Sequence, residues 1–408
     1  MSSPPLPRRT LVTRAAALST VPALGALAGP LAPPVSGATT TRSGGVTTHE
    51  ISLGGQRLAR SGTGRWATGR LDTATYRMLA LTWSGAAPGL RVRTRSGGRW
   101  SSWQALRVLH DGPDAGSGED KGRRGTDPLW LPEADGVEVL VVGRRPGDLR
   151  LVLIHAEQRA QDARVRPSLP GARAAAKDEP TDEPTGEPTD EPAEEGDATA
   201  RRPSRSPRPR LLSRSDWGAD DSWRDGKPVM CRTIHQVHVH HTASGNDYSR
   251  GDVPALIRSM YRYHTQSLGW SDIGYNFLVD KFGRTWVGRA GGPGRPVRGA
   301  HTLGFNNTSM GVAVIGNLET TGVTSKTVTA LVKLAAWKLD KYRRRPSGKV
   351  RVYCTGSDKY RRGWVKLRVI DGHRDTNDTA CPGQSLYAKL PAIRRRTRKR
   401  AKKYGGTG

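Results

Sequence analysis

The stretch that decides the fold reads Gln236-Val237-His238-Val239-His240-His241-Thr242. Aliphatic side chains alternate there with polar ones and β-branched residues are frequent, which predicts a buried strand over about Thr233–Thr242. The chain has ten histidines. Four lie in this strand: His235, His238, His240 and His241. Because side chains of a strand point alternately to its two faces, neighbouring histidines are expected to face opposite ways.

Helical and strand patterns alternate on both sides of this stretch. Further strand-like runs cover residues 276–280, 285–289, 310–315 and 365–370. Two segments instead show helical periodicity, residues 253–265 and 326–342, each with one apolar face. Strands interleaved with helices on this scale predict an α/β or α+β layer domain over about residues 211–393.

Residues 46–158 follow a different pattern. Short runs with period-two alternation are separated by Gly-Gly and Pro-Gly turns, which predicts an all-β, sandwich-like domain ahead of the α/β domain. Its tryptophans Trp100, Trp103 and Trp130 either line a sugar-binding face or fill the core, and we favour the core. This domain has no cluster of titratable groups that predicts chemistry, so we interpret it as an accessory module.

Length and composition limit the number of folded units and the kind of segments that connect and follow them. Its 408 residues suit about two folded units, and 66 Lys+Arg against 37 Asp+Glu give a net charge of +29. Residues 161–210 form an acidic and then basic Pro-rich stretch, predicted to be an extended linker. The basic tail at 394–408 is either simply solvated or suited to an anionic partner such as a cell-wall polymer. Beyond the N-terminus no apolar run approaches the ~20 residues that span a bilayer, which excludes an integral membrane protein.

The first 38 residues have the three parts of a secretory signal peptide. Arg8-Arg9 precedes an Ala- and Leu-rich stretch to Leu31, and Ser36-Gly37-Ala38 provides a small-residue cleavage site. The paired arginines indicate the twin-arginine route, and the alternative is a disordered or anchoring N-terminus. Export predicts a secreted protein associated with the cell wall, which argues against nucleic acid as the partner of the basic chain.

Two further histidines and a cysteine complete a candidate metal set. His301 and His373 follow the His-rich strand, and Cys381 lies eight residues after His373. Two imidazoles and one thiolate suit zinc with a fourth position open. Zinc lowers the pKa of its water and polarises a carbonyl group, as amide hydrolysis requires. By spacing alone, the pattern suits a packed or solvated strand as well.

Five motifs, which follow one another in order over most of residues 211–393, together resemble a known protein family. They are Ser213–Ala219, Val239–Ala243 with its His-His pair, Gly269–Phe277, Gly299–Asn306, and Gly372–Asp375 with Thr379-Ala380-Cys381-Pro382-Gly383. This run resembles the peptidoglycan recognition protein family, within the type-2 N-acetylmuramoyl-L-alanine amidases. The resemblance implies a central, mostly β-sheet flanked by helices, with zinc at the floor of a glycan-binding groove.

The same resemblance implies roles position by position. Zinc is expected on His240, His373 and Cys381. Tyr275 matches the catalytic tyrosine and Thr379 the oxyanion-stabilising position, while Trp270, His301 and Asn306 fall where relatives bind substrate. His241, His235 and His238 are interpreted as structural.

The implied function is a secreted zinc hydrolase that cleaves the amide between the muramic acid lactyl group and L-alanine of peptidoglycan. The alternative is a non-catalytic peptidoglycan receptor of the same fold; such relatives typically lose the cysteine or the tyrosine, whereas Cys381 and Tyr275 are both present. Residues 290–294 depart from the Gly-Trp pair of many relatives, which leaves the preferred stem-peptide diamino acid open. We expect a monomer.

If Cys381 holds zinc, Cys231 and Cys354 remain. In an exported protein this pair is expected to form a disulfide, the alternative being two separate buried thiols.

Overall fold

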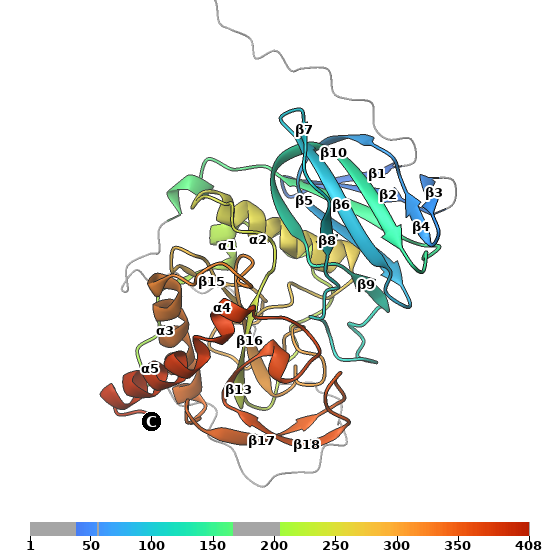
Figure 1. Cartoon of the computed structure of the whole chain (residues 1–408). Coiled ribbons are helices and arrows are strands. Elements are labelled where there is room, and N and C mark those ends of the chain that lie inside the picture. The colour runs from blue at the N-terminus through green and yellow to red at the C-terminus, as the bar shows by residue number, and fades with distance from the viewer. Residues whose placement is uncertain (1–37, 55–56, 166–204, 408) are drawn as a thin grey trace, which may run out of the picture.

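The computed structural model describes residues 38–54, 57–165 and 205–407, which form an all-β unit and an α/β unit in contact with each other (Figure 1). Residues 1–37 of the predicted signal peptide and 166–204 of the predicted linker lie outside the described residues. Among the described residues, no helix has both the length and the apolar character needed to cross a membrane.

Within its described residues, the N-terminal unit contains eleven strands. They are β1 (Ala38–Ser43), β2 (Val46–Ser52), β3 (Ala59–Gly62), β4 (Arg65–Ala67), β5 (Leu71–Ser84), β6 (Gly89–Ser96), β7 (Arg99–Trp100), β8 (Gln104–Leu106), β9 (Arg123–Gly125), β10 (Leu129–Val142) and β11 (Arg150–Ala156). The long strand β10 pairs with β5 through its first half and with β6 and β4 through its second, so it joins two layers. Leu81, Leu151, Val92 and Val139 pack between these layers in one apolar core, as predicted for a sandwich-like domain.

The predicted strand around the histidines is the centre of the second unit. Its sheet has the order β12-β15-β14-β16-β13-β19, and β13 pairs in parallel with both of its neighbours. Every residue of β13 is buried, because both faces of the sheet are covered. The strands of this unit are β12 (Leu211–Leu212), β13 (Gln236–His241), β14 (Phe277–Val279), β15 (Thr285–Val287), β16 (Ser309–Val314), β19 (Ile370–Gly372) and the separate hairpin β17 (Lys349–Cys354) and β18 (Gly363–Arg368).

Helices cover the two faces of this sheet. They are α1 (Arg214–Trp217), α2 (Asp252–Arg262), α3 (Ser325–Lys341), α4 (Gln384–Tyr387) and α5 (Leu390–Lys403). Helix α3 begins at the N-cap Thr324, whose hydroxyl accepts from the amide of Thr327, and its apolar face packs on Val237 and Val239 of β13. Helices α2 and α3 match the two segments predicted as helical, and the mixed α/β architecture is confirmed.

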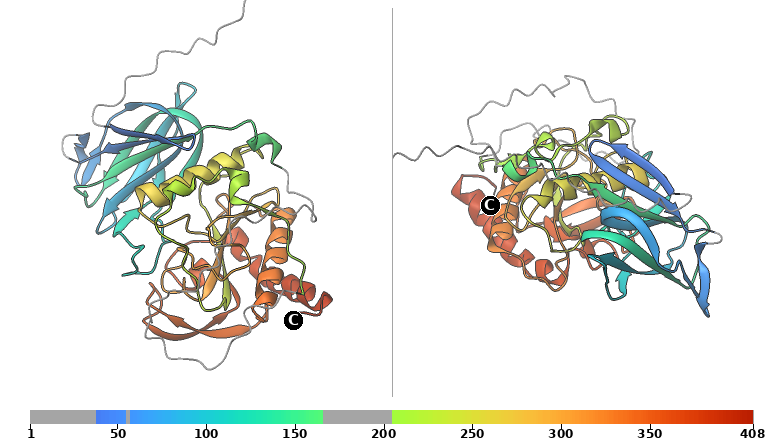
Figure 2. Two further views of the ribbon diagram at one scale, coloured as in Figure 1. Left: turned by 180° about the vertical axis from the view of Figure 1, so that it is seen from behind. Right: turned by 90° about the horizontal axis from the view of Figure 1, so that it is seen from above.

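Helix α2 also joins the two units. All of its residues are buried, and it runs across the junction between the β unit and the α/β sheet (Figure 2). Leu256 and Met260 share one apolar cluster with Val152 and Ile154 of β11. The outer face of β11 is therefore also covered, which explains its continuous apolar run Leu151–Ile154.

Two features of the α/β unit differ from the prediction. The segment predicted as a basic tail after residue 393 continues helix α5, because Leu390, Ile393, Thr397 and Ala401 recur at helical spacing and are buried. The predicted disulfide is not formed: Cys231 and Cys354 are both buried as thiols. Their sulfur atoms have separate partners, the Asn306 carbonyl for Cys231 at 3.5 Å and the Gly356 amide for Cys354 at 3.3 Å.

A buried lysine on α3 makes stability depend on pH. The ammonium group of Lys338 donates to the carbonyls of Pro293 and Arg295, both at 2.9 Å, and burial lowers its pKa to about 7. Between this value and the pKa of about 10.4 in the unfolded chain, the unfolded state binds more protons, so the free energy of unfolding rises with pH. We expect Lys338→Met to flatten this rise, as measured by urea unfolding at pH 7 and pH 9. Lys333→Met, at an exposed position of the same helix, should keep it; an unchanged slope in Lys338→Met would refute the assignment.

Candidate metal centre

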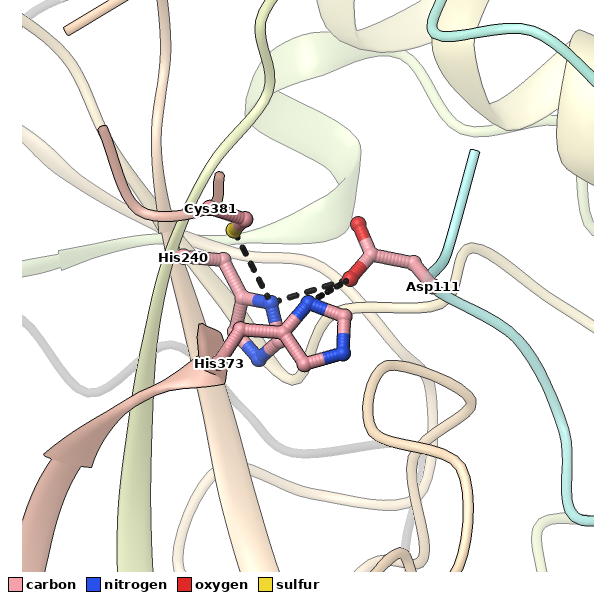
Figure 3. A group of neighbouring side chains, drawn as sticks. All are labelled: Asp111, His240, His373 and Cys381. Atoms are coloured by element: carbon pink, nitrogen blue, oxygen red, sulfur yellow. Dashed lines mark hydrogen bonds and ion pairs between the residues drawn. The ribbon is translucent and has the colours of Figure 1, made fainter. Parts of the chain in front are cut away.

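Four potential metal ligands converge at the C-terminal end of β13. His240 comes from β13, His373 from the 3-10 turn that follows β19, Cys381 from the loop before α4, and Asp111 from the N-terminal unit. Each offers one ligand atom, and these atoms all lie within 4.8 Å of one another (Figure 3). Three of the four are the residues predicted to hold zinc.

The distances inside this cluster suit a shared cation. Asp111 Oδ1 lies 3.0 Å from Nδ1 of His240 and 3.0 Å from Nδ1 of His373, and Cys381 Sγ lies 3.7 Å from His240 Nδ1. Although they are so close, Asp111 Oδ1 and His373 Nδ1 are buried atoms without a hydrogen-bond partner. Buried polar atoms normally find partners, so lone pairs that converge in this way indicate a missing positive charge.

The protonation states also suit zinc. Burial lowers the pKa of His240 to about 4, so its imidazole is neutral and offers a lone pair. Burial, followed by the nearby Asp111 carboxylate, raises the pKa of the Cys381 thiol well above its ordinary value. A buried thiol of this kind ionises only when a cation binds it, which is how metal binding and proton release are coupled. Nitrogen, sulfur and carboxylate oxygen are the ligand atoms that zinc prefers.

A hydrogen-bonded pair of side chains orients His240 from behind. If Nδ1 of His240 faces the metal, Nε2 carries the proton, and it lies 3.2 Å from the hydroxyl of Thr302. That hydroxyl in turn lies 2.9 Å from Nδ1 of His301. A ligating histidine usually donates its second N–H in this manner, which fixes its tautomer. His301 is fully buried against Gly311 of β16, where a Cβ would lie 2.3 Å from its ring, so the ring is held in place behind Thr302 and His240.

The predicted catalytic side chains lie beside the ligands. The hydroxyl of Tyr275 donates to Asp111 Oδ2 at 2.5 Å, and its ring lies 5.7 Å from that of His240. Burial and Asp111 raise the pKa of Tyr275 well above its ordinary value, so the phenol stays protonated. The Thr379 hydroxyl accepts from the amide of Cys381 at 3.2 Å. Gly274 permits the close approach of the Tyr275 backbone to Ala300, whose carbonyl a Cβ would meet at 2.5 Å.

The predicted substrate-binding residues Asn306 and Trp270 face the N-terminal unit. The Asn306 amide donates to the carbonyl of Gly112 at 3.0 Å and to Asp114 Oδ1 at 2.8 Å. Trp270 is buried, and its ring lies tilted against that of His264 with centroids 4.4 Å apart. A cavity of about 340 Å³ remains on one side of the cluster. It is lined by residues of both units, including Arg107, Asp127, His241 and Thr379.

The other histidines of β13 lie outside the ligand set. His241 points away from His240, and its Nδ1 accepts from the Leu318 amide at 3.2 Å. His238 is fully buried and lies 2.6 Å from Asp371 on the neighbouring strand β19. Asp111 was missed by the sequence interpretation, because nothing in the segment between β8 and β9 predicts that it reaches a site more than 100 residues away.

Comparisons with known proteins support this assignment of the fold. Residues 230–384 match the family described as N-acetylmuramoyl-L-alanine amidase. Residues 36–189 match a family described as Rv3811 N-terminal galactose-binding domain-like, in agreement with an all-β unit. The two matches fall on the two described units, one on each.

Individual relatives agree with the first match. Peptidoglycan-recognition protein SC2 of Drosophila melanogaster is 29% identical over 181 residues, which are 44% of this chain and 84% of that protein. Peptidoglycan-recognition protein LB of Drosophila melanogaster is 32% identical over 184 residues, which are 44% of this chain and 67% of that protein. The chain belongs to the peptidoglycan recognition protein and type-2 amidase family.

Two further similarities complete the comparison. The N-acetylmuramoyl-L-alanine amidase of Homo sapiens is 32% identical over 186 residues, 45% of this chain and 28% of that protein. Among solved structures, Drosophila PGRP-LB is 29% identical with a TM-score of 0.36, covering 45% of this chain and 93% of that one. The family match thus concerns the α/β unit, and the β unit lies outside it.

Proposed function

We propose that the chain is a zinc-dependent N-acetylmuramoyl-L-alanine amidase that acts on peptidoglycan outside the cell. The observation that carries the proposal is the convergence of His240, His373 and Cys381 on one point, beside the hydroxyl of Tyr275. A peptidoglycan receptor without turnover would need neither a thiolate ligand nor a phenol at that point. The family match and the signal-like N-terminus support the substrate and the location.

Each side chain has a proposed task in the hydrolysis. A zinc ion bound to this set would polarise the scissile carbonyl and lower the pKa of water to about 7. The protonated Tyr275 hydroxyl is placed to donate a hydrogen bond to the carbonyl oxygen as negative charge develops on it. The Thr379 hydroxyl oxygen accepts from the Cys381 amide, so the hydroxyl proton of Thr379 can be donated toward the cavity that this residue lines. The Thr302–His301 pair holds His240 in the tautomer that ligates.

Helix α5 supplies a second proposed contact with the wall. Its outer face carries the exposed side chains Arg395, Arg396, Arg398, Lys399, Lys402 and Lys403. A dense positive surface of this kind attracts polyanions by long-range electrostatics. We propose that it holds the enzyme on anionic cell-wall polymers.

The test is digestion of purified peptidoglycan by the full chain. It is carried out with the wild type and with Asp111→Ala, which removes the carboxylate that lies against both histidine ligands. We expect new L-alanine amino termini and free lactyl carboxyl groups in at least one of the two, identified by mass spectrometry. Cys381→Ala should abolish these ends in both backgrounds. If neither background generates them, the proposed function is wrong; if they persist without Cys381, the metal mechanism is wrong.

Tyr275→Phe, in whichever background is active, should lower kcat about 10²–10³-fold, because one donor to the developing oxyanion is lost. KM should change far less, since the ring remains in place. Steady-state kinetics on a soluble muramyl peptide measure both. Tyr248→Phe is the matched control: its buried hydroxyl donates to the Ile315 carbonyl at 3.0 Å, and its removal should leave kcat unchanged. Equal kcat in Tyr275→Phe and the wild type would remove Tyr275 from the mechanism.

A further inference from the structure

One acidic side chain in the metal cluster belongs to the other structural unit. Asp111 lies in the segment between β8 and β9, residues 107–122, here named the β8–β9 loop. Its side chain is 6% exposed, and one oxygen lies equally close to Nδ1 of both histidine ligands. The second oxygen accepts from the Tyr275 hydroxyl. The Asp111 carboxylate thus touches two proposed ligands and the proposed catalytic phenol at once.

Two further carboxylates of the same loop hold it to the α/β unit. Asp114 Oδ1 accepts from the Gly304 amide and from the Asn306 side chain, each at 2.8 Å. Glu119 pairs with Arg289, with one contact at 3.1 Å, and accepts from the Ser271 amide at 3.2 Å. Glu119 and Arg289 are both buried. Asp111, Asp114 and Glu119 therefore hold the loop across the metal ligands and across Asn306.

The coordination number decides what this contact means. Catalytic zinc sites have three protein ligands and keep a fourth position for water or substrate, whereas sites with four protein ligands are closed. His240, His373 and Cys381 make three. Asp111 supplies the fourth ligand atom and lies where water or substrate has to enter.

A role of Asp111 as general base fits these contacts less well. A base needs space for the water that it deprotonates and for the substrate beside it. Asp111 Oδ1 instead lies 3.0 Å from the ligand nitrogens themselves. The side-chain amide of Asn306 already donates to the Gly112 carbonyl and to Asp114 Oδ1, so it has no donor left for substrate.

We propose that Asp111 is the fourth ligand of the metal centre and that the β8–β9 loop keeps the enzyme latent by occupying its substrate groove. The latent role rests on the proposed amidase function; the ligand role does not. Opening requires the loop to leave the groove. The buried residues of the apolar junction lie on other segments, among them α2 and β11, and the partly buried Leu109 of the loop packs against them. The loop has no helix or strand of its own and contains Gly112, Gly116, Gly118 and Gly122, which lower the cost of an alternative conformation.

The first experiment reads the metal without turnover. The full chain is loaded with Co²⁺, and azide is titrated while the visible absorption of the metal is recorded. In the wild type, azide should leave the spectrum unchanged, because all four positions are filled. In Asp111→Ala and in the isosteric Asp111→Asn, azide should shift the spectrum with saturation. Asp120→Ala is the matched control on the same loop, since its side chain accepts from the Gly122 amide of the loop itself at 2.9 Å, and it should behave as the wild type. A wild-type spectrum as sensitive to azide as that of Asp111→Ala would overturn the ligand assignment.

The second experiment measures peptidoglycan cleavage by the same proteins and by Asp111→Ala/Asp114→Ala, which also releases Asn306 and Gly304. We expect the double variant to cleave at least tenfold faster than the wild type, and Asp120→Ala to match the wild type. A wild type as fast as the double variant would overturn latency, and loss of cleavage in Asp111→Ala would identify Asp111 as a catalytic residue instead. If no protein cleaves, the amidase proposal fails, and latency with it, whereas the azide titration still decides whether Asp111 is a ligand.

Discussion

Replacement of His373 by alanine is expected to lower the affinity for zinc by at least about 100-fold and to abolish turnover. The loss of a hydrogen bond that merely orients a ligand costs about 10- to 100-fold in metal affinity, so the loss of a ligand itself costs more. His373 is fully buried, and its Nδ1 lies 3.0 Å from Asp111 Oδ1. No described histidine other than His240 contributes to the cluster, so none can replace it.

Competition with a zinc-binding dye measures this affinity. His235→Ala serves as the control, because it removes a histidine next to β13 that lies outside the cluster, and it should bind zinc like the wild type. Unchanged affinity in His373→Ala would mean that the ion, if present, sits elsewhere.

Asp162→Ala is expected to lower the free energy of unfolding by about 3–5 kcal/mol, because it leaves a buried charge without its partner. Asp162 lies at the end of the N-terminal unit and pairs with Arg258 of α2 at 2.6 Å, with both side chains at most 1% exposed. Arg258 also donates to the backbone carbonyls of Trp217 and Glu157, which hold the guanidinium in place but cannot neutralise it.

Urea unfolding of the full chain measures the effect. Arg42→Ala is the control, since it breaks an ion pair with Glu157 in which Arg42 is 71% exposed, and such pairs contribute about 1 kcal/mol or less. A change in Asp162→Ala as small as that of Arg42→Ala would show that the junction does not depend on this charge pair.

Local sequence patterns predict most of the α/β unit, because its elements are short-range features. Alternation marks β13, and the apolar faces of α2 and α3 recur at helical spacing. The ligands His240, His373 and Cys381 are predicted through the family resemblance, since His240 and His373 lie 133 positions apart in the sequence and have no local relation.

Features that depend on the contact between the two units could not be predicted in this way. In the sequence, Asp111 looks like any acidic residue of a glycine-rich loop. Its place beside the metal ligands follows only from the packing of the β unit against the α/β unit. Residues 78–83 of β5 are all buried, and Met78 and Ala80 share an apolar cluster with helix α2, although the sequence alone predicts one solvated face. Helix α5 was not predicted beyond residue 393, because basic residues dominate that segment and its four buried positions are few and widely spaced.

X-ray absorption at the zinc edge tests most directly whether one zinc ion binds at His240, His373 and Cys381. We expect one zinc per chain with one sulfur neighbour at about 2.3 Å and nitrogen or oxygen neighbours at about 2.0–2.1 Å. Cys381→Ser should lose the sulfur neighbour and keep the others. A protein that takes up no stoichiometric zinc, or a sulfur neighbour that persists in Cys381→Ser, would contradict the account.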